Sequence, residues 1–147
     1  MPYRLAIASD HGGLELKSAL LSYLQERQYD IVDLGTNTSD SVDYTEYAHI
    51  LAEHVLTHEK TLGILVCGTG IGMSLAANRY SGIRAALCTD TYMARMAREH
   101  NDANVLCMGG RVTGIGLAEH IVDMFLKTEF VGGRHLRRIN QLDPANK

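Results

Sequence analysis

The sequence contains only three cysteines in 147 residues, and it has neither a C-x-x-C motif nor any close pair of cysteines. Cys67, Cys88 and Cys107 are odd in number and lie far apart in the chain. This spacing argues against a disulfide framework and against a zinc site. Cys88 and Cys107 each lie at or near the end of an apolar run, so we interpret them as small, buried and unreactive side chains.

Long apolar runs and long basic runs are also missing. No segment approaches the roughly 18 consecutive apolar residues that a membrane-spanning helix needs. The N-terminus, MPYRLAIASD, holds too short an apolar stretch for a signal peptide. The formal net charge of −3 does not suit a nucleic-acid surface. We therefore expect a cytoplasmic protein of one domain, residues 1–147, with neither nucleic acid nor membrane as a partner.

Glycines are present, yet the familiar phosphate-binding motifs are missing. Three glycines follow Cys67 in the stretch CGTGIG, at Gly68, Gly70 and Gly72. Met73 occupies the position where a dinucleotide fingerprint needs its third glycine, and no P-loop pattern occurs. Met73 also occupies the position where a C-x5-R cysteine phosphatase needs its arginine. The sequence therefore argues against all three classes of protein.

A regular alternation of strand-like and helical segments is what the sequence does contain. Apolar or β-branched runs predict five strands, at residues 3–9, 29–35, 62–68, 83–89 and 103–109. Helices are predicted at residues 14–27, 44–58, 70–79, 90–99 and 113–126. Five consecutive strand–helix units predict a three-layer α/β/α fold, Rossmann-like, with a five-stranded parallel sheet. Ligands of such sheets bind beside the carboxyl ends of the strands.

The stretch from Cys67 to Gly72 joins a predicted strand to a predicted helix. Glycines allow a tight turn that exposes backbone N–H groups, and the start of a helix adds partial positive charge. Such a loop can hold an anion, including one that forms transiently during a reaction. A thiol beside it ionises more readily and can act as a base or a nucleophile. The residues alone leave a second interpretation open, in which Cys67 is a buried structural cysteine.

The motifs SDHGG, CGTGIG, REHNDANVL, GGRV and GGRHLRRI occur in this order along the chain. Together they resemble the type B ribose-5-phosphate isomerases, within the wider group of ribose and galactose isomerases, from residue 3 to about residue 140. The resemblance implies interconversion of ribose 5-phosphate and ribulose 5-phosphate in the pentose phosphate pathway, with neither metal nor cofactor. It also implies strand order 2-1-3-5-4 and a homodimer with shared active sites, which can assemble further into a tetramer.

The resemblance also implies which residues carry the chemistry. Cys67 is implied to take a proton from C2 of the sugar and to return it to C1. His100 is implied to open the furanose ring, which suits the ordinary histidine pKa of about 6.5. Thr69 is implied to hydrogen-bond the thiolate or the substrate, and the N–H groups of residues 68–72 to stabilise the enediolate. The residues alone leave another interpretation of His100 open: it lies near the C-terminal end of a predicted helix and could stabilise that end through the helix dipole.

The remaining matches concern substrate binding. The residues implied to bind the substrate are Asp10, His11, Tyr44, Gly68, Thr69, Gly70, Ile71, Gly72, Asn101, Arg111, Arg134 and Arg138. Two of them have a second explanation from the residues alone. Asp10 is suited to cap the helix that follows it, and Tyr44 is suited to be a core aromatic at the start of a helix.

Three of these residues, Arg111, Arg134 and Arg138, are implied to hold the phosphate, which the rigid arginine fork suits. Arg134 and Arg138 are four apart and share one face if the tail is helical, whereas Arg137 then points elsewhere. The tail, residues 128–147, is implied to reach the neighbouring subunit's site after a Gly-Gly hinge. The alternative interpretation is that RHLRR is a basic segment near the C-terminus that is exposed to solvent and binds nothing.

Other functions remain open at the level of the sequence. A relative that acts on allose 6-phosphate or galactose 6-phosphate is one alternative, and loop 36–43 does not reveal the length of the sugar. A protein that only binds sugar phosphates is another, as is a hydrolase or transferase with Cys67 as nucleophile. His54 and His58 lie four apart, a spacing that can bind a metal. With no third ligand evident, we interpret them as surface residues and predict no metal site.

Overall fold

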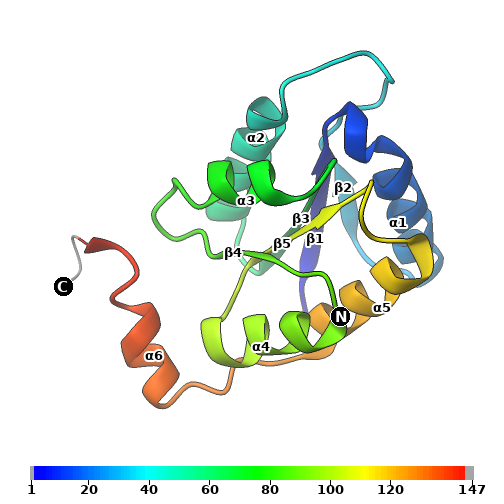
Figure 1. The fold of residues 1–147 in the computed structure, drawn as a ribbon. Coiled ribbons are helices and arrows are strands. Elements are labelled where there is room, and N and C mark those ends of the chain that lie inside the picture. Colours follow the sequence, from blue (N-terminus) through cyan, green and yellow to red (C-terminus); the bar gives the residue numbers. More distant parts are fainter. Residues whose placement is uncertain (1, 145–147) are drawn as a thin grey trace.

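A computed structural model describes residues 2–144 and contains a five-stranded parallel sheet (Figure 1). The strands are β1 (Arg4–Ser9), β2 (Ile31–Asp33), β3 (Thr61–Cys67), β4 (Ala85–Leu87) and β5 (Val105–Gly109). Their order across the sheet is β2-β1-β3-β5-β4, and every neighbouring pair is parallel. The parallel sheet and its strand order both confirm the prediction from the sequence.

Helices cover both faces of this sheet (Figure 1). They are α1 (Leu14–Glu26), α2 (Tyr44–Thr57), α3 (Ile71–Ala77), α4 (Thr91–Asn101), α5 (Ile115–Lys127) and α6 (Arg134–Ile139), with a 3-10 turn at His11–Gly13. One core cluster joins the sheet to α1, α4 and α5, and a second joins it to α2 and α3. The three-layer α/β/α prediction is therefore confirmed. Helix α6 lies beside α4, outside the layers.

The centre of the sheet is β3, whose seven residues are all buried. Ile64 and Val66 pack with α1, α4 and α5, whereas Leu65 and Cys67 pack on the side of α2 and α3. A strand that is buried on both faces explains the nearly continuous apolar run LGILVC. The same alternation turns Cys67 toward α2 and α3 at the carboxyl end of the strand, where ligands of parallel sheets bind.

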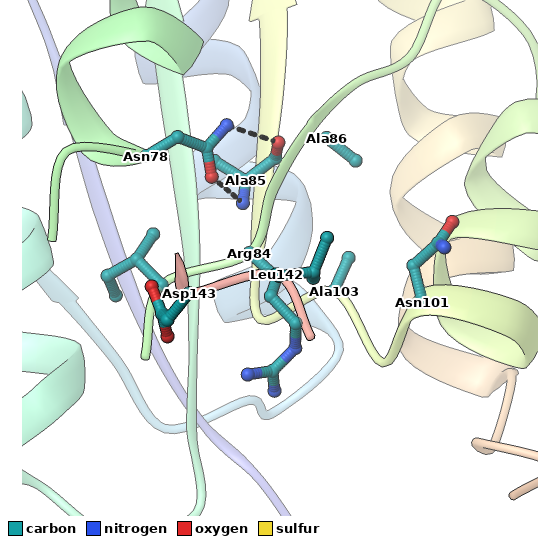
Figure 2. A pocket seen from close by; sticks show the side chains of 9 residues that line it. Asn78, Arg84, Ala85, Ala86, Asn101, Ala103, Leu142 and Asp143 are labelled. Atoms are coloured by element: carbon teal, nitrogen blue, oxygen red, sulfur yellow. Dashed lines mark hydrogen bonds between the residues drawn. The ribbon is translucent and has the colours of Figure 1, made fainter. Parts of the chain in front are cut away.

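The two edge strands are shorter than the sequence suggested. β2 and β4 have three residues each, because an edge strand has a neighbour on one side alone to continue the ladder. The free side of β4 is occupied by the side chain of Asn78. Ala85 donates its N–H to Oδ1 of Asn78 at 2.8 Å, and its carbonyl accepts from Nδ2 at 2.9 Å. Figure 2 shows these two hydrogen bonds in the wall of a pocket of about 340 Å³.

The C-terminal tail contains a helix, α6, so the condition under which Arg134 and Arg138 share one face is met. On α6, Arg134 and Arg138 lie one turn apart, and both side chains are exposed. Gly132 and Gly133 precede the helix with φ of +75° and +60°, the region that favours glycine. Residues 145–147 of the predicted tail lie outside the described residues. Across residues 2–144, no helix is long and apolar enough to span a membrane.

Candidate active site

The loop after β3 is fixed by close backbone packing. Gly70 has φ +83°, and a Cβ there would lie 2.6 Å from Leu87 Cδ1 and 2.8 Å from the Met108 carbonyl carbon. A Cβ on Gly109, at the end of β5, would lie 2.6 Å from the carbonyl carbon of Thr69. The loop therefore rests directly against the end of β5, and only glycine fits on either side of the contact.

Cys67 begins this loop, and a backbone donor directs its sulfur. Sγ accepts a hydrogen bond from the N–H of Gly70 at 3.1 Å, and the residue is 5% exposed. Oγ1 of Thr69 accepts from the N–H of Ile71 at 3.2 Å, so the hydroxyl hydrogen remains available to a ligand. The side chains of Cys67 and Thr69 are thus both oriented by N–H groups of the loop itself.

The other two cysteines differ from Cys67 in their surroundings. Burial, with a smaller contribution from Asp90, raises the pKa of Cys88 to about 12. Burial also raises the pKa of Cys107. Thiols with raised pKa values stay protonated at neutral pH and react slowly. The interpretation of Cys88 and Cys107 as buried residues is confirmed.

Tyr44, the first residue of α2, lies over the loop and outside the core clusters. Its side chain is 40% exposed, and a Cβ on Gly72 would lie 2.7 Å from its ring. The glycine therefore lets the ring approach the first turn of α3. Of the two interpretations that the sequence left open, the geometry favours a tyrosine at the rim of the loop.

The loop after β1 brings Asp10 and His11 to the same edge of the sheet. Oδ1 of Asp10 accepts from the N–H of Gly13 at 3.0 Å and caps the turn that leads into α1. Nδ1 of His11 accepts from the N–H of Val42 at 3.1 Å, so in the neutral ring Nε2 carries the hydrogen. Capping occupies one oxygen of Asp10, which leaves the second oxygen for the predicted substrate contact.

Arg111 extends across the loops after β1 and β3. A Cβ on Gly68 would lie 3.2 Å from Nη1 of Arg111, and a Cβ on Gly12 would lie 3.4 Å from Nη2. Both glycines therefore leave room for the guanidinium group. A pocket of about 360 Å³ opens beside it, with His11 and Thr113 in its wall. An imidazole and a guanidinium at one pocket suit an anionic group such as a phosphate.

His100 and Asn101 end α4 and lie at the amino edge of the sheet, away from Cys67 (Figure 1). β5 begins just after them, at Val105, and ends at Gly109, which pairs with Cys67. Four residue steps along β5 separate the two edges by about 13 Å. The chain by itself therefore does not bring His100 or Asn101 into contact with the loop after β3.

Buried side chains hold this end of α4 in place. Arg98, which is 2% exposed, donates to Asp102 Oδ1 at 3.2 Å and to the Tyr3 hydroxyl at 3.3 Å. Since Tyr3 immediately precedes β1, the contact ties α4 to the amino edge. Asn101 lines the pocket beside β4, with Arg84 on another of its walls (Figure 2).

The predicted site residues thus fall into two groups, which the sequence analysis did not separate. The glycine-loop group consists of Asp10, His11, Tyr44, Cys67, Gly68, Thr69, Gly70, Ile71, Gly72 and Arg111. The α4–α6 group consists of His100, Asn101, Arg134 and Arg138.

The α4–α6 group includes a further residue that the sequence analysis did not single out. His135 is the buried residue of α6, and its ring stacks on that of His100 with centroids 4.2 Å apart and planes 10° apart. The pKa of His135 lies below its usual value because of burial, and His100, Arg134 and Arg138 lower it further. The two histidines are far apart in the chain, so no periodic pattern in the sequence indicates their contact.

His54, on α2, and His58, the residue that follows the helix, form a second stacked pair. Their ring centroids are 3.9 Å apart, and the pKa of His54 is lowered by burial and by His58. Among residues 2–144, no group of three or more His, Cys, Asp or Glu side chains is placed to hold a metal ion. The pair therefore has no further ligand in the part of the chain that the structure describes.

Comparison with known proteins finds relatives over nearly the whole chain. A family model described as Ribose/Galactose Isomerase matches residues 5–142. Ribose-5-phosphate isomerase B of Escherichia coli is 44% identical over 139 residues, which cover 95% of this chain and 93% of that protein.

Solved structures match the fold closely. The crystal structure of a ribose 5-phosphate isomerase from Thermotoga maritima has a TM-score of 0.96 and 51% sequence identity, covering 98% of this chain and 99% of that one. Ribose-5-phosphate isomerase B from Mycoplasma genitalium, with bound ribulose-5-phosphate, has a TM-score of 0.93 and 44% identity, covering 99% of this chain and 97% of that one.

Proposed function

The chain belongs to the ribose/galactose isomerase family, and from this premise we propose that it interconverts ribose 5-phosphate and ribulose 5-phosphate. One observation carries the proposal: the Cys67 thiol, directed by the Gly70 N–H, lies at the carboxyl edge of the sheet near Arg111. The relative with bound ribulose-5-phosphate supports a pentose phosphate over the allose and galactose 6-phosphate alternatives. The proposed reaction uses neither metal nor cofactor.

The first step is ring opening, which we assign to His100. The imidazolium passes a proton to the ring oxygen O4 as the C1–O4 bond breaks. The hydroxyl on C1 releases a proton to water, so an aldehyde forms at C1 and a hydroxyl at C4. Histidine suits this step because its ordinary pKa of about 6.5 lets it give and take protons near neutral pH.

The second step is proton transfer between C2 and C1, which we assign to Cys67. The thiolate takes the proton from C2, and the electron pair forms a C1–C2 double bond while negative charge develops on O1. The thiol then returns the proton to C1, and the hydroxyl proton of O2 passes to O1, which leaves a carbonyl at C2. We assign the N–H groups of residues 68–72 to the developing charge, because prealigned donors stabilise such anions.

The phosphate is held by arginines of both groups. Arg111 lies beside His11 at one pocket, and Arg134 and Arg138 are exposed on α6. Within residues 2–144, none of these three arginines forms an ion pair. Guanidinium groups that are free of carboxylates are available for the two-point hydrogen bonding that phosphate oxygens accept.

The two groups meet, in this proposal, between the subunits of a homodimer. A two-fold axis places the α4–α6 group of one copy against the glycine-loop group of the other, and so makes two equal sites. Ile71 and Leu75 on α3, at 52% and 56% exposed, and Leu136 on α6, at 49%, are apolar side chains that such an interface would cover. The resemblance implies a homodimer that can assemble further into a tetramer, and the dimer is the unit in which both sites are complete.

The test is an assay of the purified protein with ribose 5-phosphate in the presence of EDTA. We expect ribulose 5-phosphate to form, and Cys67→Ala to lower kcat by about a thousandfold, since general-base catalysis commonly contributes about that factor. Cys88→Ala is the matched control, a buried cysteine in the other core cluster, and should retain kcat. Absence of turnover with pentose phosphates would refute the proposal, and turnover of hexose phosphates alone would favour the alternative.

A further inference from the structure

Helix α6 is attached to the rest of the protein at few points. His135 is its buried residue, at 8% exposed. The segment before the helix is tied by a hydrogen bond from the N–H of Val131 to the carbonyl of Glu99, at 3.1 Å. Between them, Gly132 and Gly133 both have positive φ, and a Cβ on either glycine would meet no atom within 4 Å. After the helix, Ser81 Oγ donates a hydrogen bond to Asp143 Oδ2 at 2.9 Å. Within α6 itself, the contacts of His135 therefore hold the helix against α4.

The main contact of His135 is with His100. Their rings are nearly parallel, with planes 10° apart and centroids separated by 4.2 Å. In the part of the chain that the structure describes, neither ring takes part in a side-chain hydrogen bond, whereas His11 accepts one from Val42. The orientation of His100 is therefore set by the stack, in contrast to that of His11, which is set by a hydrogen bond.

We propose that His135 is a positioning residue for ring opening. Its ring, stacked on His100, fixes the direction of the imidazole that passes a proton to the ring oxygen, and it holds Arg134 and Arg138 at a set distance from that imidazole. The proposal rests on the proposed function. The sugar links the ring oxygen to the phosphate through fixed bonds, so the imidazole and the arginines must keep a matching separation.

The charges around His135 are consistent with this role. The groups that face it are His100 from α4 and Arg134 and Arg138 from its own helix, and together with burial they lower its pKa. His135 is therefore neutral at neutral pH. A neutral imidazole adds no second positive charge to the stack, so charge repulsion does not oppose its contact with His100.

The two directions of the reaction separate this role from a merely structural one. Ribose 5-phosphate is a closed furanose and must be opened, whereas ribulose 5-phosphate stays open because its C5 oxygen carries the phosphate. Exchange of the C1 hydrogen of ribulose 5-phosphate in D2O therefore needs the base but no ring opening. We define the opening ratio as kcat for ribose 5-phosphate divided by this exchange rate, both at saturating substrate.

We expect His135→Leu and His135→Ala to lower the opening ratio by about tenfold or more, because small misplacements of a catalytic group have effects of this size. His135→Phe keeps a flat ring of suitable size and should hold the ratio within about threefold of the wild-type value. Arg137→Ala, on the exposed face of the same helix, should leave the ratio unchanged.

Two outcomes would overturn the proposal: an unchanged ratio in His135→Leu, or a loss in His135→Phe as large as that in His135→Leu. Leu and Phe both fill the space of the imidazole, so this pair decides the question even if His135→Ala does not fold. A wild-type protein inactive in both directions would instead refute the proposed function, and the two failures are therefore distinguishable.

Discussion

The glycine-loop group and the α4–α6 group are held in place by opposite means. Backbone contacts fix the first: Gly70 and Gly109 leave no space for a side chain, and an N–H directs Cys67. Side chains fix the second, chiefly through the stack of His135 on His100. The difference indicates that the proposed base lies in a rigid part of the molecule. Two of the residues proposed to act on the partner's substrate, Arg134 and Arg138, lie instead on a more weakly attached helix.

The strongest test of the comparison mixes subunits that are defective in different groups. Cys67→Ala and Arg134→Ala should each be nearly inactive alone. In an equal mixture, half of the dimers are heterodimers with one intact site of two, so activity should recover to about a quarter of the wild-type value. Kinetic assays before and after subunit exchange measure the recovery.

The matched control for this mixture combines two variants of the same group. Cys67→Ala and His11→Ala both damage the glycine-loop group, so every site in a heterodimer carries one defect and no activity should return. Recovery of activity in this control would show that the two groups are not divided between subunits in the way we propose. The first mixture would show the same if its subunits exchange and no activity returns.

The second test addresses the rigidity of the glycine-loop group. Gly109→Ala would place Cβ 2.6 Å from the Thr69 carbonyl carbon, and we expect it to lower the free energy of unfolding by about 3 kcal/mol. Gly116→Ala on α5, where nothing lies within 4 Å, should instead raise it by about 0.5 kcal/mol. Urea unfolding measures both, and equal effects of the two substitutions would contradict the packing argument.

A third test concerns the two glycines before α6. Glycine is needed there because of the backbone conformation, whereas a side chain would meet no neighbouring atom. Gly133→Ala meets no neighbouring atoms, but φ of +60° with ψ of −133° is a conformation that glycine adopts far more readily than alanine, so the substitution strains the backbone by about 2 kcal/mol. We expect α6 to shift and KM for the sugar phosphate to rise about fivefold, with little change in the stability of the core. A loss of stability as large as that of Gly109→Ala, with KM unchanged, would argue against this distinction.

The smallest expected effect is on the pH dependence of stability. Because burial, with the nearby charges, lowers the pKa of His135 in the folded protein, the unfolded chain takes up a proton at about pH 6.5 that the folded chain does not. The free energy of unfolding should therefore fall as the pH drops through this value. Urea midpoints measured on either side of it should fall less in His135→Phe than in the wild type.

A second histidine provides the comparison for this last measurement. The pKa of His54 is also lowered by burial and by His58, and it lies on α2, away from α6. His54→Gln should therefore remove a separate share of the acid sensitivity while leaving the opening ratio unchanged. If neither substitution alters the pH dependence, the titration of these histidines does not contribute to it.

Much of the fold was predictable because buried positions are occupied by apolar residues, whose spacing differs between strands and helices. The continuous apolar run of β3 and the apolar stripes of α2 and α5 indicate which side chains face the core. The lengths of β2 and β4 were not predictable, since apolar residues continue beyond the paired ones, at Leu34 and Cys88. Strand order came from the resemblance to a known family, because residue patterns alone do not give the order of parallel strands.

The site was predictable residue by residue but not in its arrangement. The glycine loop is recognisable in the sequence because only glycine tolerates the φ of Gly70 and the close approach at Gly72. His100 is separated from Cys67 because it lies at the C-terminal end of α4, at the opposite edge of the sheet. The type of residue alone does not predict the edge at which it lies. The contact between His100 and His135 depends on the path of the tail, for which the sequence contains no periodic signal.

The hydrogen bonds between Asn78 and Ala85 also bear on how copies of this protein associate. An open sheet edge can recruit further strands, from other copies or from unfolded chains, and so lead to aggregation. Here the amide of Asn78 occupies both the donor and the acceptor of Ala85, in a strand of three residues. Growth of the sheet beyond β4 is thereby blocked, and ordered assembly is left to the helices and loops that carry the two groups.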